Sequence, residues 1–268
     1  MQYLAIEPFT VTRKLVAGVF IILLTCFSLS GCQTVSPTGL SGSGSDKIIP
    51  QKMLWAWERP EDLRFLESKD HGVAFLAQTL AITGDDIAVS PRRQPLEVNP
   101  ETFLMAVTRI ETDRASTPKY STGQIQKITR AVMRTLYLKN VKALQIDFDA
   151  ATSERNFYRA LLKDLRAQIP AEIPFSITAL ASWCTADSWL TGAPVDEVVP
   201  MAFRMGADAA SIRGFLGSGK DWQEPLCQKS YGFSIDEPFE KKLVNGRRIY
   251  FFNDRAWKKS DLSMTDNF

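Results

Sequence analysis

The sequence predicts a compact (β/α)8 TIM barrel, an α/β fold in which eight parallel strands alternate with helical segments. Three observations support this fold class. Eight apolar, strand-like runs follow one another within about 200 residues. The fourth run leads into a helical pattern and then a fifth strand, which is the order of a βαβ unit. No Gly-rich phosphate loop follows the first run, so a doubly wound open sheet is the second choice.

Each predicted strand is a short run of β-branched, aromatic and other apolar residues bounded by turn formers or charges. The fourth is the most informative, because Gln145, Asp147 and Asp149 alternate with apolar residues and therefore point to one face. The predicted strands are Met53–Trp57, Val73–Ile82, Phe103–Ile110, Ala143–Phe148, Phe175–Trp183, Glu197–Arg204, Tyr231–Ile235 and Arg248–Asn253.

Helical segments are expected between the strands, and some must be short because the chain is near the lower length limit of the fold. In the second segment Ile125, Ile128 and Val132 recur at helical spacing. Ser153 is a candidate N-cap of the third segment. The predicted segments are Arg59–Ser68, Gly123–Leu138, Ser153–Gln168, Asp187–Thr191 as a short helix or turn, and Ala207–Leu216.

A β-hairpin insertion is predicted after the second strand. Gly84-Asp85-Asp86 interrupts the apolar run, and residues 87–96 continue as an extended segment. Pro91 and Pro95 lie in that segment, and proline fits an edge strand or a loop better than a central strand. The hairpin is therefore expected to project beyond the barrel.

Residues 1–31 predict a lipoprotein signal peptide. Two basic residues precede an apolar run that ends in Leu29-Ser30-Gly31-Cys32, which resembles a bacterial lipobox. The resemblance implies a lipid anchor on Cys32 that holds the protein to a membrane of the cell envelope. Because Gln33 rather than aspartate follows, it also implies the outer membrane, facing the periplasm. The alternatives are an uncleaved transmembrane helix, for which the apolar run is short, or an ordinary signal peptide.

Three further segments follow the signal peptide. Residues 32–50 are rich in Ser, Gly, Thr and Pro and form a flexible tether, residues 51–258 form the barrel domain, and residues 259–268 are a polar tail that we expect to fray. The barrel domain contains Cys184 and Cys227. In an exported protein these two cysteines are expected to form a disulfide, with two buried free thiols as the alternative.

Charge and composition argue against several classes of function. The chain has 32 Lys and Arg residues against 30 Asp and Glu residues and no basic block, so nucleic acid is not expected as a partner. His71 is the only histidine, which argues against a zinc site, and no Gly-x-Ser-x-Gly elbow is present. We therefore predict neither a metal nor a cofactor.

The C-terminal strand ends of a barrel line one mouth, and here they carry acids, arginines and tryptophans. Glycosidic bond cleavage uses one carboxyl group as an acid and a second as base or nucleophile. Indole rings pack on the apolar faces of sugars, while arginine and asparagine bind hydroxyl groups. The predicted catalytic residues are Asp147, Asp149, Glu58 and Glu111. The predicted substrate-binding residues are Trp57, Arg109, Gln145, Trp183, Arg204, Asp236 and Asn253.

Structural roles compete with these assignments. Asp149 at a strand end is suited to capping the following turn. Asp147, if buried, needs a partner such as Arg109 or Arg204. Two neighbouring carboxylates repel, so one of them is expected to have a raised pKa. Trp183 fits core packing as well as it fits a sugar platform.

Four motifs resemble an uncharacterised family of bacterial exported proteins, a domain of unknown function related to TIM-barrel glycoside hydrolases. The resemblance extends from about Leu54 to Trp257 and implies a barrel that acts on or binds a glycan. The motifs are Leu54-Trp-Ala-Trp-Glu-Arg-Pro60, Gln145-Ile-Asp-Phe-Asp-Ala150, Ser176-Ile-Thr-Ala-Leu-Ala-Ser-Trp-Cys184 and Val195-Asp-Glu-Val-Val-Pro-Met-Ala-Phe-Arg-Met-Gly206.

The fourth predicted strand is also similar to the Asp-x-x-Asp-x-Asp-x-Glu motif of chitinase-like hydrolases, in which the final glutamate donates the proton. In one register the glutamate position falls on Ala151. In the other, Asp149 replaces the glutamate and Gln145 replaces an aspartate. Either way the glutamate is absent, so a catalytically inactive binding or scaffold lipoprotein of the cell envelope is the alternative to a glycoside hydrolase.

Overall fold

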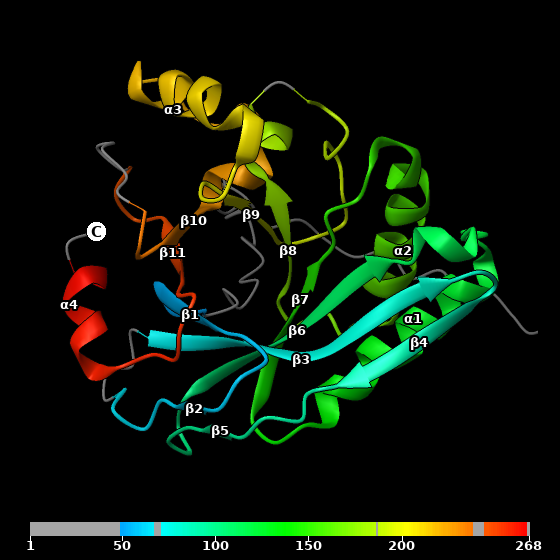
Figure 1. Ribbon diagram of the computed structural model, residues 1–268, viewed down its shortest axis with the longest axis horizontal. Helices are drawn as coiled ribbons and strands as arrows, with labels where there is room; N and C mark the ends of the chain where they lie inside the picture. The colour runs from blue at the N-terminus through cyan, green and yellow to red at the C-terminus, as the bar shows by residue number, and fades with distance from the viewer. Residues whose placement is uncertain (1–48, 67–70, 186, 238–243, 267–268) are drawn as a thin grey trace, which may run out of the picture. The chain divides into compact units, whose positions relative to one another are not determined.

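The computed structural model describes residues 49–66, 71–185, 187–237 and 244–266 (Figure 1). Within them eight parallel strands form a ring. Each strand pairs with the next, and β1 pairs with both β3 and β11. This closure confirms the predicted barrel and excludes the open sheet. The ring consists, in order, of β1 (Lys52–Ala56), β3 (His71–Thr83), β6 (Phe103–Thr112), β7 (Val141–Asp147), β8 (Phe175–Leu180), β9 (Glu197–Met201), β10 (Ser230–Ser234) and β11 (Arg248–Phe252).

All eight predicted runs contain a barrel strand, and the main differences lie at their C-terminal ends. The fifth run was predicted to extend to Trp183, but β8 ends at Leu180 and a 3-10 helix, Ala181–Cys184, follows. The sixth was predicted to reach Arg204, but β9 ends at Met201. Arg204 has φ of 49°, a left-handed conformation that a strand cannot contain.

Three helices of more than one turn cover the described part of the barrel. They are α1 (Thr122–Arg134), which continues as a 3-10 helix (Thr135–Tyr137), α2 (Arg155–Gln168), which a 3-10 helix (Thr152–Glu154) precedes, and α3 (Ala209–Gly217), which a 3-10 helix (Gly206–Asp208) precedes. Two further 3-10 helices are Arg114–Ser116 and Pro225–Lys229. α1 and α2 lie side by side, and α3 lies away from them (Figure 1).

One predicted helical segment and one cap were wrong. The described part of Arg59–Ser68 contains β2 (Glu61–Asp62), which pairs with β5 (Leu96–Glu97). Asp187–Thr191, predicted as a short helix or a turn, contains a turn. Ser153 does not cap α2. Instead the Glu154 carboxylate accepts a hydrogen bond of 2.6 Å from the Ala151 backbone N–H, because the chain enters α2 through a 3-10 turn.

The predicted hairpin is present after the second barrel strand. β3 continues past the barrel and pairs antiparallel with β4 (Asp86–Pro91) across a turn at Gly84, which has φ of 50°. The hairpin lies against α1, where the Gln124 side chain donates hydrogen bonds to the carbonyls of Gly84 and Asp86. The insertion therefore takes the place that a helix would occupy between the second and third strands.

Strand alternation divides the apolar residues into two cores. Met53, Trp55, Met105 and Tyr250 belong to the core inside the barrel. The larger core lies between the strands and the helices. The inner core also holds buried polar groups, such as Glu197, whose carboxylate accepts hydrogen bonds from the Arg248 guanidinium (2.5 Å) and the Tyr250 hydroxyl (2.8 Å). A buried charge requires hydrogen-bonding partners of this kind to compensate for its lost contact with water.

Cys184 and Cys227 form a disulfide with a Cα–Cα distance of 6.0 Å. It joins the 3-10 helix after β8 to the 3-10 helix before β10. The C-terminal tail, expected to fray, instead contains a 3-10 helix (Lys259–Asp261) and α4 (Leu262–Thr265). The Asp261 carboxylate is buried and accepts hydrogen bonds from Arg255 and Asn253, which attaches the tail to the barrel.

The predicted signal peptide and Cys32 lie outside the described residues. In the part of the chain that is described, no helix is long and apolar enough to span a membrane.

Candidate active site at the barrel mouth

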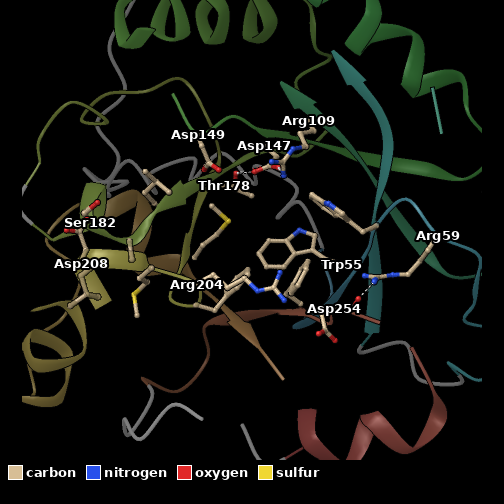
Figure 2. A pocket seen from close by; sticks show the side chains of 18 residues that line it. Trp55, Arg59, Arg109, Asp147, Asp149, Thr178, Ser182, Arg204, Asp208 and Asp254 are labelled. Atoms are coloured by element: carbon tan, nitrogen blue, oxygen red, sulfur yellow. Dashed lines mark hydrogen bonds and ion pairs between the residues drawn. The ribbon is translucent and has the colours of Figure 1, made fainter. Parts of the chain in front are cut away.

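A cavity of about 470 Å³ opens at the C-terminal ends of the barrel strands (Figure 2). One part of its wall carries Asp147, the last residue of β7, and Asp149, two residues beyond the end of that strand. The rest is largely apolar and comes from strands β1, β8, β9 and β11 and the residues after them, while Arg109 comes from β6. Its aromatic residues are Trp55, Trp57, Phe203 and Phe252, and its arginines are Arg59, Arg109 and Arg204.

Asp147 is buried and held by two partners. Its Oδ1 accepts a hydrogen bond of 2.7 Å from the Thr178 hydroxyl, and its Oδ2 accepts one of 3.1 Å from Arg109 Nη1. Arg109 lies opposite Asp147 in the register of β6 and β7, and its Nε also donates to Glu111 at 2.8 Å. Burial raises the pKa of Asp147, while Arg109 and Thr178 oppose that rise.

Asp149 differs from Asp147 in exposure and in partners. Its side chain is exposed, and no described side chain forms an ion pair or hydrogen bond with it. Desolvation, followed by the charge of Asp147, raises the pKa of Asp149 to about 6, and Arg109 opposes the rise. Near that pH Asp149 can exchange a proton with a molecule in the cavity.

Trp55 forms part of the cavity wall and is fixed from several sides. Its indole N–H donates a hydrogen bond of 2.8 Å to Gln145 Oε1, and Gln145 Nε2 donates in turn to the Ser176 hydroxyl at 3.0 Å. Gly232 gives the indole room, because a Cβ at this position would lie 3.0 Å from Trp55 Cη2 and from the Pro200 carbonyl oxygen. The ring is therefore positioned before any ligand arrives.

Five of the predicted site residues line this cavity: Asp147, Asp149, Trp57, Arg109 and Arg204. The predicted partner of Asp147 was Arg109 or Arg204, and the structure places Arg109 there. Arg204 forms no ion pair with either aspartate. Its guanidinium lies over the Phe252 ring at 4.8 Å from the centroid.

The other predicted residues do not line the cavity. Gln145 lies behind Trp55, and Glu111 binds Arg109 beside an adjoining cavity of about 340 Å³. Glu58 accepts a hydrogen bond from the Arg93 backbone N–H.

The remaining three face elsewhere because the strands end earlier than predicted. Trp183 is buried in the outer core against Trp189, with ring centroids 4.8 Å apart. Asn253 is fully buried and donates a hydrogen bond to Asp261, and Asp236 is exposed outside the cavity.

Sequence reasoning missed several residues of the wall. Thr178, Phe203 and Phe252 lie on inward positions, and extending the alternation of each strand through its end finds them. No alternation pattern could have identified Asp208, which lies next to α3. The path of the chain after β9 brings it to the cavity. No cluster of three or more His, Cys, Asp or Glu side chains suited to a metal occurs among the residues described.

Residues 103–200 match DUF3142, a domain of unknown function. The segment begins with β6 and includes Asp147 and Asp149, and within it the resemblance to an uncharacterised domain is confirmed. No curated protein matches the sequence.

Three solved structures are similar to the chain. A family GH18 chitinase from Chromobacterium violaceum is 10% identical over 76% of this chain and 78% of that chain, with a TM-score of 0.48. The chitinase domain of the spore coat protein CotE from Clostridium difficile is 12% identical over 62% and 53%, with a TM-score of 0.38. The spore cortex-lytic enzyme SleL from Bacillus cereus is 14% identical over 70% and 52%, with a TM-score of 0.40. These similarities concern the fold.

We predict that Gly232→Ala destabilises the barrel and displaces Trp55. The added methyl group meets a backbone carbonyl and an indole at 3.0 Å, and overpacking of this kind costs about 1–3 kcal/mol. Urea unfolding and tryptophan fluorescence measure the two effects. The control is Gly214→Ala within α3, where a Cβ meets nothing within 4 Å and a helical alanine is favoured over glycine. Equal unfolding midpoints for the two variants would contradict the packing argument.

We predict that Asp149→Asn stabilises the protein at neutral pH but not below pH 4. The pKa of Asp149 is about 6 in the folded protein, against 3.8 for a carboxyl group without these interactions. Between these two pH values the folded state therefore binds more protons than the unfolded state. The wild type therefore loses stability as pH rises from about 4 to 6. Because the side chain is exposed, solvent screening limits the difference to on the order of 1 kcal/mol. Urea midpoints from pH 4 to 8 measure it, and a pH-independent difference would refute the assignment.

Proposed function

We propose that the barrel mouth binds a glycan and that Asp149 acts as a general acid on a glycosidic bond. The proposal rests chiefly on one observation: an unpaired carboxyl group with a pKa of about 6 shares an open cavity with an aromatic wall. A general acid needs a proton near the working pH and access to the leaving oxygen. Asp149 meets both requirements, whereas Asp147 is buried and held by its partners.

The aromatic residues support a sugar as the ligand. The indole of Trp57 is half-buried at the cavity, and Phe203 and Phe252 are stacked with centroids 5.2 Å apart. Flat apolar surfaces of this kind suit the C–H faces of pyranose rings, while carboxylates and arginines bind hydroxyl groups. Pockets that bind small molecules combine the same elements, largely apolar walls and a few placed polar groups.

The two aspartates divide the chemistry between them. Protonated Asp149 gives its proton to the glycosidic oxygen as the bond to the sugar carbon breaks. Water then adds to that carbon and returns a proton to Asp149. Asp147 contributes negative charge beside the reacting carbon, where positive charge develops. Arg109 and Thr178 hold Asp147 in place for that role.

The second candidate is a protein that binds a glycan without cleaving it. Arg109 and Thr178 occupy both oxygens of Asp147, which leaves Asp149 as the one freely accessible carboxyl group of the pair. Alanine at position 151 also stands where one register of the hydrolase motif requires glutamate. A scaffold lipoprotein would keep the aromatic wall and bind its ligand at an acid centre that no longer turns over.

We predict that Asp149→Asn lowers hydrolysis about 100-fold or more but preserves glycan binding, because the amide cannot donate the proton. Release of reducing ends from purified peptidoglycan and from chitooligosaccharides measures activity, and calorimetry measures binding. The wild-type rate should fall as pH rises above about 6. Asp236→Asn, which changes an exposed carboxyl outside the cavity, is the matched control. Full activity of the Asp149→Asn variant would exclude Asp149 as the general acid. If the wild type binds the glycan but releases no reducing ends, the second candidate is favoured.

We also propose that Cys32 carries a lipid that anchors the protein in the bacterial envelope, at the outer membrane and facing the periplasm. The described chain begins at Ile49 and Pro50, whose carbonyls accept hydrogen bonds from Arg248 at the N-terminal end of β11. This end of the barrel is opposite the mouth. A tether attached there leaves the mouth open to a glycan.

Labelled palmitate should enter the wild type, and Cys32→Ala should abolish the incorporation and release the protein from the membrane fraction. Cys26→Ala is the control, because Cys26 lies within the predicted signal peptide and is expected to be removed with it. Palmitate incorporation that survives Cys32→Ala, or a wild type that incorporates none, would contradict the anchor.

A further inference from the structure

Arg204 differs from the other two arginines of the cavity in having no polar partner for its side chain. Arg109 binds Asp147 and Glu111. Arg59 binds Glu61 and donates to the carbonyls of Asn253 and Asp254. The Arg204 guanidinium forms no ion pair or hydrogen bond with a described residue, although it lines the same cavity.

The backbone of Arg204 is held in an unfavourable conformation. Its φ of 49° is left-handed, which costs a non-glycine residue on the order of 1 kcal/mol. The Glu237 carboxylate accepts a hydrogen bond of 3.0 Å from the Arg204 backbone N–H, and Arg213 of α3 binds the same carboxylate at 3.0 Å. Two elements beyond β9 therefore stabilise a conformation that the chain alone disfavours.

The guanidinium lies over the Phe252 ring, with Cζ 4.8 Å from the ring centroid. Stacking restricts the side chain and leaves the N–H groups at the edge of the guanidinium free to donate. Such an edge matches the two oxygens of a carboxylate. In Figure 2, Arg204 enters the cavity from a different wall than the Asp147–Arg109 pair.

We propose that Arg204 makes the mouth selective for a glycan that carries a carboxylate. This inference rests on the proposed glycan binding and specifies its substrate class. Arg204 binds the carboxylate of an acidic sugar, while Asp149 faces the glycosidic oxygen. No ion pair or side-chain hydrogen bond among the described residues uses the charge of Arg204. Anion recognition accounts for its charge, its stacking and the conformation in which it is held.

The test compares pairs of oligosaccharides in which one member carries carboxylates and the other is neutral. One pair is alternating N-acetylglucosamine and N-acetylmuramic acid strands against chitooligosaccharides of equal length. The other is oligogalacturonate against its methyl ester. The wild type should bind the acidic member of at least one pair about tenfold more tightly, which corresponds to one charge-assisted contact. The preference should weaken at high salt.

Arg204→Gln should remove the acidic preference, so that the acidic and the neutral member of a pair bind with similar affinity. Arg204→Lys keeps the positive charge but loses the planar pair of N–H donors, so it should retain part of the preference for the acidic member. Arg130→Gln, on the exposed side of α1, is the control and should behave as the wild type. Arg204→Gly should lose the preference yet raise the Tm by a few degrees, since glycine accepts the left-handed conformation. If Arg204→Gly is more stable than the wild type and still loses the preference, unfolding cannot be the cause of that loss.

The outcomes separate this inference from the proposed function. Equal binding of both members of each pair by the wild type, or an acidic preference that persists in Arg204→Gln, would overturn the role of Arg204 and leave glycan binding standing. Binding of no member of either pair by the wild type would count against the proposed function itself, and the present inference would fail with it.

Discussion

Closure of the strand ring is the constraint on which the rest of this structure depends. β1 forms backbone hydrogen bonds with β3 on one side and with β11 on the other. The tilt and the register of every strand between them must therefore be compatible with a closed ring. Closure also brings the C-terminal ends of all eight strands to one rim. Residues as distant in sequence as Trp55 and Phe252 thereby meet in one cavity. Without the ring, the acidic end of β7 would have no facing aromatic wall.

Electrostatics at the rim follow from how deeply each carboxyl group lies. Asp147 is the last residue of β7 and points into the barrel, where burial disfavours its charge and Arg109 and Thr178 oppose that effect. Asp149, two residues later, projects from the end of the same face into solvent. Its pKa rises because partial desolvation and, to a smaller extent, the charge of Asp147 act together. One strand thus supplies a fixed carboxylate and an exchangeable one.

The compactness of the barrel explains its irregular outer layer. Between the described strands, 3-10 turns, a hairpin and a disulfide accompany the three longer helices. The Cys184–Cys227 bond joins two such connections. The β3–β4 hairpin extends the outer surface on the side of α1. A chain near the lower length limit of the fold can therefore still cover its strands.

Local sequence patterns determined the strands, the hairpin and the two long helices, because alternation and helical spacing are properties of short segments. They also placed Asp147 and Asp149 on one face at the mouth. The same patterns placed Trp183 and Asn253 at the site wrongly, since the turn after a strand decides which way the next residue faces. Only the tertiary structure selected Arg109 over Arg204 as the partner of Asp147 and brought Asp208 to the cavity. Those choices depend on distances between segments far apart in the chain, and a local pattern contains no information about such distances.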